Sequence, residues 1–306
     1  MRHSVSAVIA VLAFTVFVPS ARADIIPLPA TFKVRDIVTN GATIHVRAGG
    51  KGPAVVLLHG YADTGDMWGA LAIELAARYT VIIPDLRGLG LSKAIGGFDK
   101  KTQAGDVVGV LDALKVGKTA VVAHDIGNMV AFAFVAQHPD RVTKAVFMDA
   151  PIPGVGPWEE ILKSPLLWHF RFGGPDMERL VKGRERIYLD RFWNEFSADP
   201  RRIDEATRVH YAKLYARPGV MHAGFSQFAA FDQDARDNQE FLSRGKLTIP
   251  ILAVGGEKSF GSTMATVMRA AASNVEEVVI PNSGHWLMEE QPQATIAAVR
   301  TFLDAK

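Results

Sequence analysis

The sequence lacks cysteine altogether, although it has 306 residues. This absence excludes disulfide bonds, thiolate metal sites and a cysteine nucleophile. The sequence also lacks an excess of charge of either sign, because 34 basic residues stand against 32 acidic ones. So balanced a chain gives no reason to expect nucleic acid or a charged membrane surface as a partner. No motif indicates a metal ion or an organic cofactor.

Long hydrophobic runs are rare, and the most prominent one lies at the N-terminus. Residues 5–18 are apolar except for Ser6 and Thr15, and an Ala-x-Ala cleavage pattern follows at residues 21–23. The run is shorter than the roughly 20 residues that a membrane-spanning helix needs. The alternative interpretation is an uncleaved membrane anchor. We expect residues 1–23 to be a signal peptide and the mature chain to begin at Asp24. The protein would then be a secreted or periplasmic bacterial protein, with no membrane association after cleavage.

Short β-branched runs alternate with longer stretches of helical period in the rest of the chain. Strands are predicted at residues 43–46, 54–58, 80–84, 119–123, 144–148, 249–254 and 277–280, with helices between them, for example at residues 66–78, 102–114 and 127–138. Runs that are apolar on every side suit strands covered on both faces. The alternation predicts an α/β fold with a mostly parallel sheet and helices on both faces.

The alternation breaks after residue 151. Residues 152–244 show no convincing strand and are rich in tryptophan and phenylalanine. We expect a helical lid here, inserted after the sixth core strand, with residues 24–151 and 245–306 forming the core. Such a lid excludes water and lines an apolar pocket. The alternative is that its aromatic side chains form only the lid's own core.

The most informative loop follows the strand at residues 119–123. It reads His124-Asp125-Ile126-Gly127 and opens a helix. The pattern is similar to the G-x-S-x-G turn that exposes a nucleophile at the edge of a sheet, with Asp125 in place of serine. An aspartate that only caps the helix is the alternative. In such sites two backbone N–H groups hold an oxyanion, and here Tyr61 and Ile126 would supply them.

Two further loops supply an acid and a base. Asp149 follows the strand at residues 144–148, and His285 follows the last predicted strand. A histidine base oriented by an acid is the logic of a catalytic triad. Many folds that carry such a triad place the acid one strand later, where this chain has Ser259. Asp149 is therefore favoured, with Glu257 as the weaker candidate.

These residues together resemble the α/β-hydrolase superfamily, specifically its epoxide hydrolase and dehalogenase branch. The resemblance implies an α/β-hydrolase fold, a charge-relay role for Asp149 and a general-base role for His285. It also implies that His169 in the lid donates a hydrogen bond or a proton to the epoxide oxygen. It places three aromatic residues in the substrate pocket, namely Trp168, Phe228 and Trp286.

The lid departs from the epoxide hydrolase pattern at one position. A second donor, a tyrosine, is expected where this chain has Phe228, which has no hydroxyl. The candidates to replace it are Gln227, Tyr188, Tyr211 and Tyr215.

An aspartate nucleophile limits the reaction. A carboxylate is charged at neutral pH and attacks saturated carbon without a base, whereas an ester would give an unfavourable mixed anhydride. We expect a hydrolase that opens a small apolar epoxide to a vicinal diol through an alkyl-enzyme ester. The alternatives are a dehalogenase with the same triad and a haloalkane substrate, or a secreted binding or effector protein on a hydrolase scaffold. For the oligomeric state, a homodimer is an alternative to a monomer.

Overall fold

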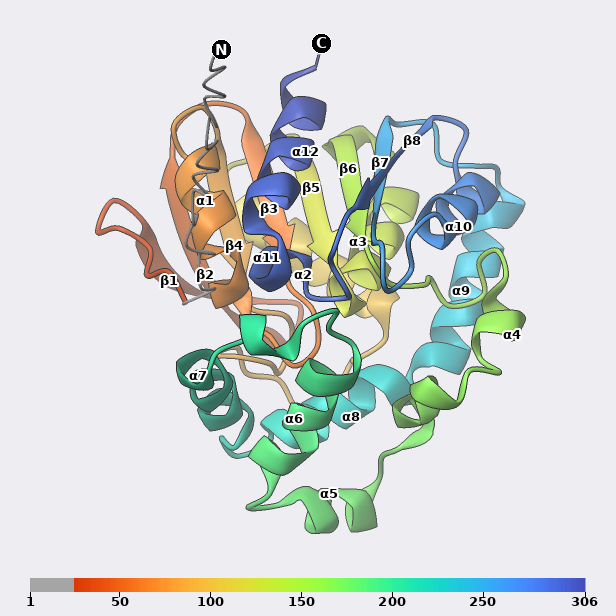
Figure 1. The fold of residues 1–306 in the computed structure, drawn as a ribbon. Coiled ribbons are helices and arrows are strands. Elements are labelled where there is room, and N and C mark those ends of the chain that lie inside the picture. The colour runs from red at the N-terminus through yellow and green to blue at the C-terminus, as the bar shows by residue number, and fades with distance from the viewer. Residues whose placement is uncertain (1–24, 306) are drawn as a thin grey trace, which may run out of the picture.

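The computed structural model describes residues 25–305, so the expected signal peptide and its cleavage site lie outside the described residues. One eight-stranded sheet forms the centre of the molecule, in the order β1-β2-β4-β3-β5-β6-β7-β8 (Figure 1). The strands are β1 (Lys33–Thr39), β2 (Ala42–Gly50), β3 (Ala54–Leu58), β4 (Thr80–Pro84), β5 (Thr119–His124), β6 (Val142–Met148), β7 (Ile251–Gly256) and β8 (Val275–Ile280).

The sheet is parallel except at one edge, where β1 pairs with β2 and β2 pairs with β4 in antiparallel fashion. The predicted mostly parallel sheet is therefore confirmed, and the seven predicted strands correspond to β2–β8. The edge strand β1 was not predicted. Ile37 is its only fully buried residue, so β1 shows almost none of the hydrophobic patterning of the inner strands.

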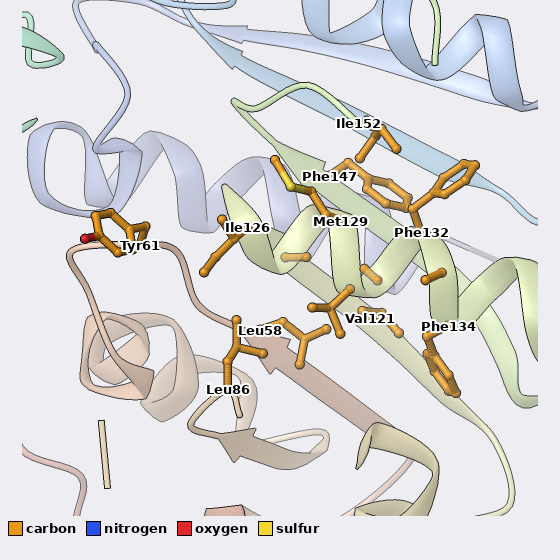
Figure 2. Close-up of a cluster of buried hydrophobic side chains, with 14 of the residues drawn as sticks. Leu58, Tyr61, Leu86, Val121, Ile126, Met129, Phe132, Phe134, Phe147 and Ile152 are labelled. Carbon is orange, nitrogen blue, oxygen red and sulfur yellow. The ribbon is translucent and has the colours of Figure 1, made fainter. Parts of the chain in front are cut away.

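Helices cover both faces of the sheet. One hydrophobic core joins α1 (Gly69–Leu75) and α12 (Pro292–Asp304) to residues such as Val122, and the other joins α2 (Lys100–Ala113), α3 (Ile126–Gln137) and α10 (Thr263–Ala271) to residues such as Val121. Figure 2 shows side chains of α3 and of β3, β5 and β6 in the second core. Successive strand residues point to opposite faces, which explains the two cores. Short helices complete this part, at Gly65–Trp68 (η1), Pro139–Arg141 (η2) and Leu287–Glu290 (α11).

The segment between β6 and β7, which we call the insertion, consists of helices and connecting loops and contains none of the eight strands of the described sheet. Figure 1 shows most of its helices beyond one end of the sheet, away from the C-terminus. They are α4 (Trp158–Ile161), η3 (Pro165–Arg171), α5 (Pro175–Val181), α6 (Glu185–Glu195), η4 (Pro200–Arg202), α7 (Glu205–Tyr215), α8 (Val220–Ala229) and α9 (Phe231–Ser243).

Buried polar contacts fasten the insertion to the rest of the fold. Lys100 at the start of α2 pairs with Asp234 of α9 at 3.1 Å, and both side chains are almost completely buried. The backbone N–H of Ala62, in the loop after β3, donates to the hydroxyl of Tyr215 at 2.8 Å. These contacts fix the insertion over the ends of the strands. Within residues 25–305, no helix has the length and apolar character needed to cross a membrane.

Candidate active site

Asp125 occupies a tight turn between β5 and α3. Its backbone has φ +51° and ψ −123°, a conformation that residues other than glycine rarely adopt. Gly127 lets α3 pack closely, since a Cβ there would lie 2.4 Å from the carbonyl oxygen of Leu58. Gly60 gives similar room, because a Cβ on it would lie 3.0 Å from the Cβ of Asp125. The turn therefore projects the Asp125 side chain out of the sheet edge in a strained but fixed position.

The loop after β3 brings a backbone donor to this carboxylate. The N–H of Tyr61 donates to Oδ2 of Asp125 at 2.8 Å. The predicted partner, Ile126, is the first residue of α3, and its N–H belongs to the positive end of that helix. The hydroxyl of Tyr215 also donates to the carbonyl of Asp63 at 3.3 Å, which holds the Tyr61 loop from the insertion side. The residues predicted to form the oxyanion hole thus flank Asp125.

His285 and Asp149 meet at the same edge of the sheet. Nδ1 of His285 lies 3.0 Å from Oδ2 of Asp149, whose side chain is completely buried. The other oxygen, Oδ1, accepts the N–H groups of Gly256 at 2.7 Å and Phe260 at 3.1 Å. Glu257, the weaker candidate, is exposed and accepts the N–H of Asn282. Asp149 is therefore the acid that contacts the histidine.

The environment of His285 raises the pKa of its imidazole ring. Burial lowers its pKa, while the hydrogen bond to Asp149 and the charges of Asp125 and Asp149 raise it by more, so the pKa lies above the ordinary histidine value. The neighbouring His124 has a pKa of about 4 because of burial and the proximity of His285. Nε2 of this neutral His124 lies 2.8 Å from the carbonyl oxygen of His285 and so holds the backbone of His285 in place.

A cavity of about 390 Å³ lies between the sheet edge and the insertion. Asp125, Asp149 and His285 line it together with apolar and aromatic side chains. The predicted pocket residues Phe228 and Trp286 belong to this lining. The other lining residues include Tyr61, Ile161, Leu166, Leu167, His169, Phe170, Phe192 and Phe196. A concave, mainly apolar site with a few convergent polar groups suits a small apolar substrate.

The prediction that Trp168 lines the pocket is wrong. Trp168 is 42% exposed and packs on the outside of the insertion against Phe172 and the guanidinium of Arg191. It belongs to the short helix η3, in which neighbouring residues point in directions about 120° apart. Leu167, His169 and Phe170 of this helix take the directions that face the cavity, and Trp168 takes the outward one.

His169 faces the cavity from the insertion. Its ring lies 4.9 Å from that of Phe192 and 5.2 Å from that of Phe228, measured between centroids. Burial among these rings lowers its pKa to about 4, although the charge of Asp125 acts in the opposite direction. His169 is therefore neutral at neutral pH and suited to donate a hydrogen bond rather than to act as a cationic acid.

The side chain of Tyr61 is the site feature that sequence reasoning missed. Tyr61 was predicted only for its backbone N–H, yet its ring lines the cavity and packs on Phe228 at 4.7 Å. Phe192 and Phe196 in the lining were not singled out either. Because aromatic residues are frequent throughout the insertion, the sequence gives no signal for which of them face the cavity.

Comparison with known proteins identifies the family to which this fold belongs. Residues 53–292 match the family model described as the alpha/beta hydrolase fold. The chain belongs to the α/β-hydrolase family. It is 34% identical over 274 residues to the soluble epoxide hydrolase of Corynebacterium sp. (strain C12), covering 86% of this chain and 94% of that protein. It is 27% identical over 297 residues to the fluoroacetate dehalogenase of Burkholderia sp, covering 89% of this chain and 94% of that protein.

A solved structure extends the similarity to the backbone. The Cif epoxide hydrolase from Acinetobacter nosocomialis superposes with a TM-score of 0.85 at 25% identity, covering 90% of each chain. The expected resemblance to the epoxide hydrolase branch of the family is therefore confirmed. An α/β hydrolase of this kind takes small substrates.

Proposed function

We propose that this protein is an epoxide hydrolase that forms a covalent ester on Asp125 and releases a vicinal diol. The observation that supports this proposal most directly is the carboxylate of Asp125. It accepts a hydrogen bond from the Tyr61 N–H at 2.8 Å, in a cavity that also contains the His285–Asp149 pair. A carboxylate nucleophile next to a separate base suits displacement at saturated carbon followed by ester hydrolysis. The similarity to epoxide hydrolases in sequence and in structure supports the same reaction.

The first step needs no base. One oxygen of Asp125 attacks an epoxide carbon, the ring C–O bond breaks, and its electron pair goes to the ring oxygen. Donors must then stabilise the developing alkoxide. His169 lines the cavity and offers one N–H for this purpose.

The second step uses the base. His285 removes a proton from a water molecule, which attacks the carboxyl carbon of Asp125. The N–H groups of Tyr61 and Ile126 stabilise the negative charge that develops on the carboxyl oxygen. Collapse of this intermediate breaks the acyl C–O bond, and the leaving oxygen takes the proton that His285 holds. The second proton of the attacking water passes from the carboxyl group of Asp125 to the alkoxide of the first step, or to the group that protonated it, so the diol is released and Asp125 is again a carboxylate. Asp149 holds His285 in the orientation and tautomer that the step requires.

A dehalogenase reaction is the second candidate, because the chain is also similar to a fluoroacetate dehalogenase. The same triad would expel halide instead of opening a ring. A haloacetate substrate needs a cation for its carboxylate, and Lys258 is the only lysine or arginine among the cavity-lining residues in the part of the chain that the structure describes. The apolar cavity fits a haloalkane better than a haloacid.

Trapping of the ester in a His285→Gln variant tests the proposal. This variant should form the ester and fail to hydrolyse it. We expect incubation with an aryl epoxide to raise the intact mass by the whole epoxide, with the addition mapped to Asp125. Asp125→Ala in the same background is the control and should form no adduct. An adduct with a bromoalkane alone would identify a dehalogenase, and no adduct with either would favour a binding or effector protein.

We also propose that the protein is exported, on the basis of the N-terminal sequence pattern alone. Intact mass of the protein from the periplasm or medium of a bacterial host should correspond to a chain that begins at Asp24. A chain that retains residues 1–23 in the membrane fraction would contradict cleavage.

A further inference from the structure

The helix η3, which carries His169, depends on outside contacts for its orientation. It is a short 3₁₀ helix, a type with poor internal hydrogen-bond geometry, and Leu167 within it has non-helical angles (φ −95°, ψ 20°). Within residues 25–305, one hydrogen bond joins η3 to another helix or strand. It runs from Nη2 of Arg191 in α6 to the carbonyl oxygen of Leu166, at 2.9 Å. Arg191 is therefore the polar attachment of η3.

Arg191 also packs against both η3 and the wall of the cavity. Its guanidinium carbon lies 4.8 Å from the ring centre of Trp168, on the outside of η3. The same carbon lies 5.3 Å from the ring centre of Phe192 and 5.2 Å from that of Phe196, and both of these rings line the cavity. A planar guanidinium stacks on aromatic faces and donates hydrogen bonds in fixed directions. This one residue thus fastens the backbone and a side chain of η3 to α6.

The charge of Arg191 reaches His169 as well. Burial lowers the pKa of Arg191, but a guanidinium stays charged at neutral pH. The low pKa of His169, about 4, is due first to burial, and the positive charge of Arg191 acts in the same direction. The charge of Asp125 and the carbonyl of Leu166, which Arg191 holds, act in the opposite direction. Arg191 therefore helps to keep the imidazole neutral.

We propose that Arg191 is a positioning residue, which holds η3 against α6 and so sets where the ring of His169 enters the cavity. Arg191 is not among the residues that line the cavity, so its effect on a bound molecule must pass through η3. The consequence for catalysis rests on the proposed epoxide hydrolase function. A hydrogen-bond donor that is misplaced by about 1 Å can lower a rate by about 10²-fold.

An NMR titration of His169 tests the position and the charge together, without any substrate. Arg191→Met removes the charge and the bond to Leu166 and keeps most of the side-chain volume. The pKa of His169, assigned with a His169→Asn variant, should rise from about 4 towards the ordinary histidine value. Arg191→Lys keeps a positive charge but loses the planar stacking, and should give a smaller rise. An unchanged pKa of His169 in Arg191→Met would overturn the inference.

The rate of ester formation tests the consequence for catalysis. In the His285→Gln background, the rate is measured by intact mass as a function of epoxide concentration. Adding Arg191→Met should lower the rate at saturating epoxide by about tenfold or more, because His169 acts on the oxygen that becomes charged as the ring opens. The epoxide concentration that gives half of this rate should change by less than about threefold. A change in that concentration alone would contradict the positioning role.

Arg186→Met is the matched control. Arg186 belongs to the same helix, α6, but its ion pairs are to Asp190 and Glu205 rather than to η3. Its loss should leave both the pKa of His169 and the rate of ester formation close to those of the parent. An effect on ester formation as large as that of Arg191→Met would overturn the inference. If the His285→Gln parent forms no ester, the proposed function has failed, and the titration of His169 still decides whether Arg191 positions this residue.

Discussion

Replacing Asp149 by asparagine tests the catalytic role of the acid while keeping its shape. The N–H groups of Gly256 and Phe260 both point at Oδ1 of Asp149, so the single oxygen of an asparagine will be held there. Its NH₂ group must then face Nδ1 of His285, in place of the oxygen that now lies 3.0 Å away. A donor there requires Nδ1 to be an acceptor, so the ring proton moves to Nε2. His285 can then no longer take a proton from water.

The size of the expected effect follows from this change of tautomer. In a triad the wrong tautomer lowers turnover by about 10⁴-fold, or about 5 kcal/mol of transition-state stabilisation. Ester formation on Asp125 needs no base and should proceed at the wild-type rate. Rapid-quench mass spectrometry should therefore show one equivalent of ester that decays about 10⁴-fold more slowly than in the wild type.

A matched control uses the neighbouring acid. Glu257 follows β7, and its exposed carboxylate pairs with Lys258 and the N–H of Asn282. Glu257→Gln should hydrolyse the ester at nearly the wild-type rate. The reasoning is refuted if Asp149→Asn hydrolyses the ester within tenfold of the wild type, or if Glu257→Gln shows the larger loss.

Three further predictions concern pH, packing and the attachment of the insertion. The rate of ester hydrolysis should fall tenfold per pH unit below the raised pKa of His285, because the protonated ring cannot accept a proton from water. A rate that stays constant down to pH 5 in stopped-flow measurements would contradict this prediction. Gly127→Ala should destabilise the fold by about 2 kcal/mol in urea unfolding, whereas Gly117→Ala, whose Cβ would meet nothing within 4 Å, should change it little. Lys100→Met should lower the free energy of unfolding by about 3–5 kcal/mol in the same assay, since it leaves Asp234 buried without its cation. Combining Lys100→Met with Asp234→Leu should recover most of this loss.

The parts of the fold that the sequence predicts are those with strong local patterns. The buried strands β3–β7 read as short apolar runs, and each reactive residue predicted at a strand end, such as Asp125 and Asp149, lies at the sheet edge as expected. Strand β1 was not predicted because all of its residues except Ile37 are exposed or half-buried, so it lacks a hydrophobic pattern although it pairs with β2 and packs on α2. An edge strand needs no hydrophobic pattern to pair.

The aromatic lining of the cavity is less predictable because it depends on tertiary orientation. Trp168 and His169 are adjacent in sequence, yet only His169 turns inward. The side chain of Tyr61 enters the site because Gly224, more than 160 positions away in the chain, leaves it room. No local period encodes such a contact. The placement of Asp125, Asp149 and His285 at one edge of the sheet was therefore accessible from motifs, whereas the shape of the cavity required the fold.

The strained backbone at Asp125 has a consequence for how related sequences evolve. A non-glycine residue with φ +51° and ψ −123° is less stable than glycine at the same place by roughly 1–3 kcal/mol. A lineage that abandons the reaction and keeps only the scaffold gains stability as soon as glycine replaces this aspartate, and no selection opposes the change. If Asp125 is the nucleophile, its strained conformation is a cost that only the reaction offsets. We therefore expect a relative with glycine at this position to lack the reaction.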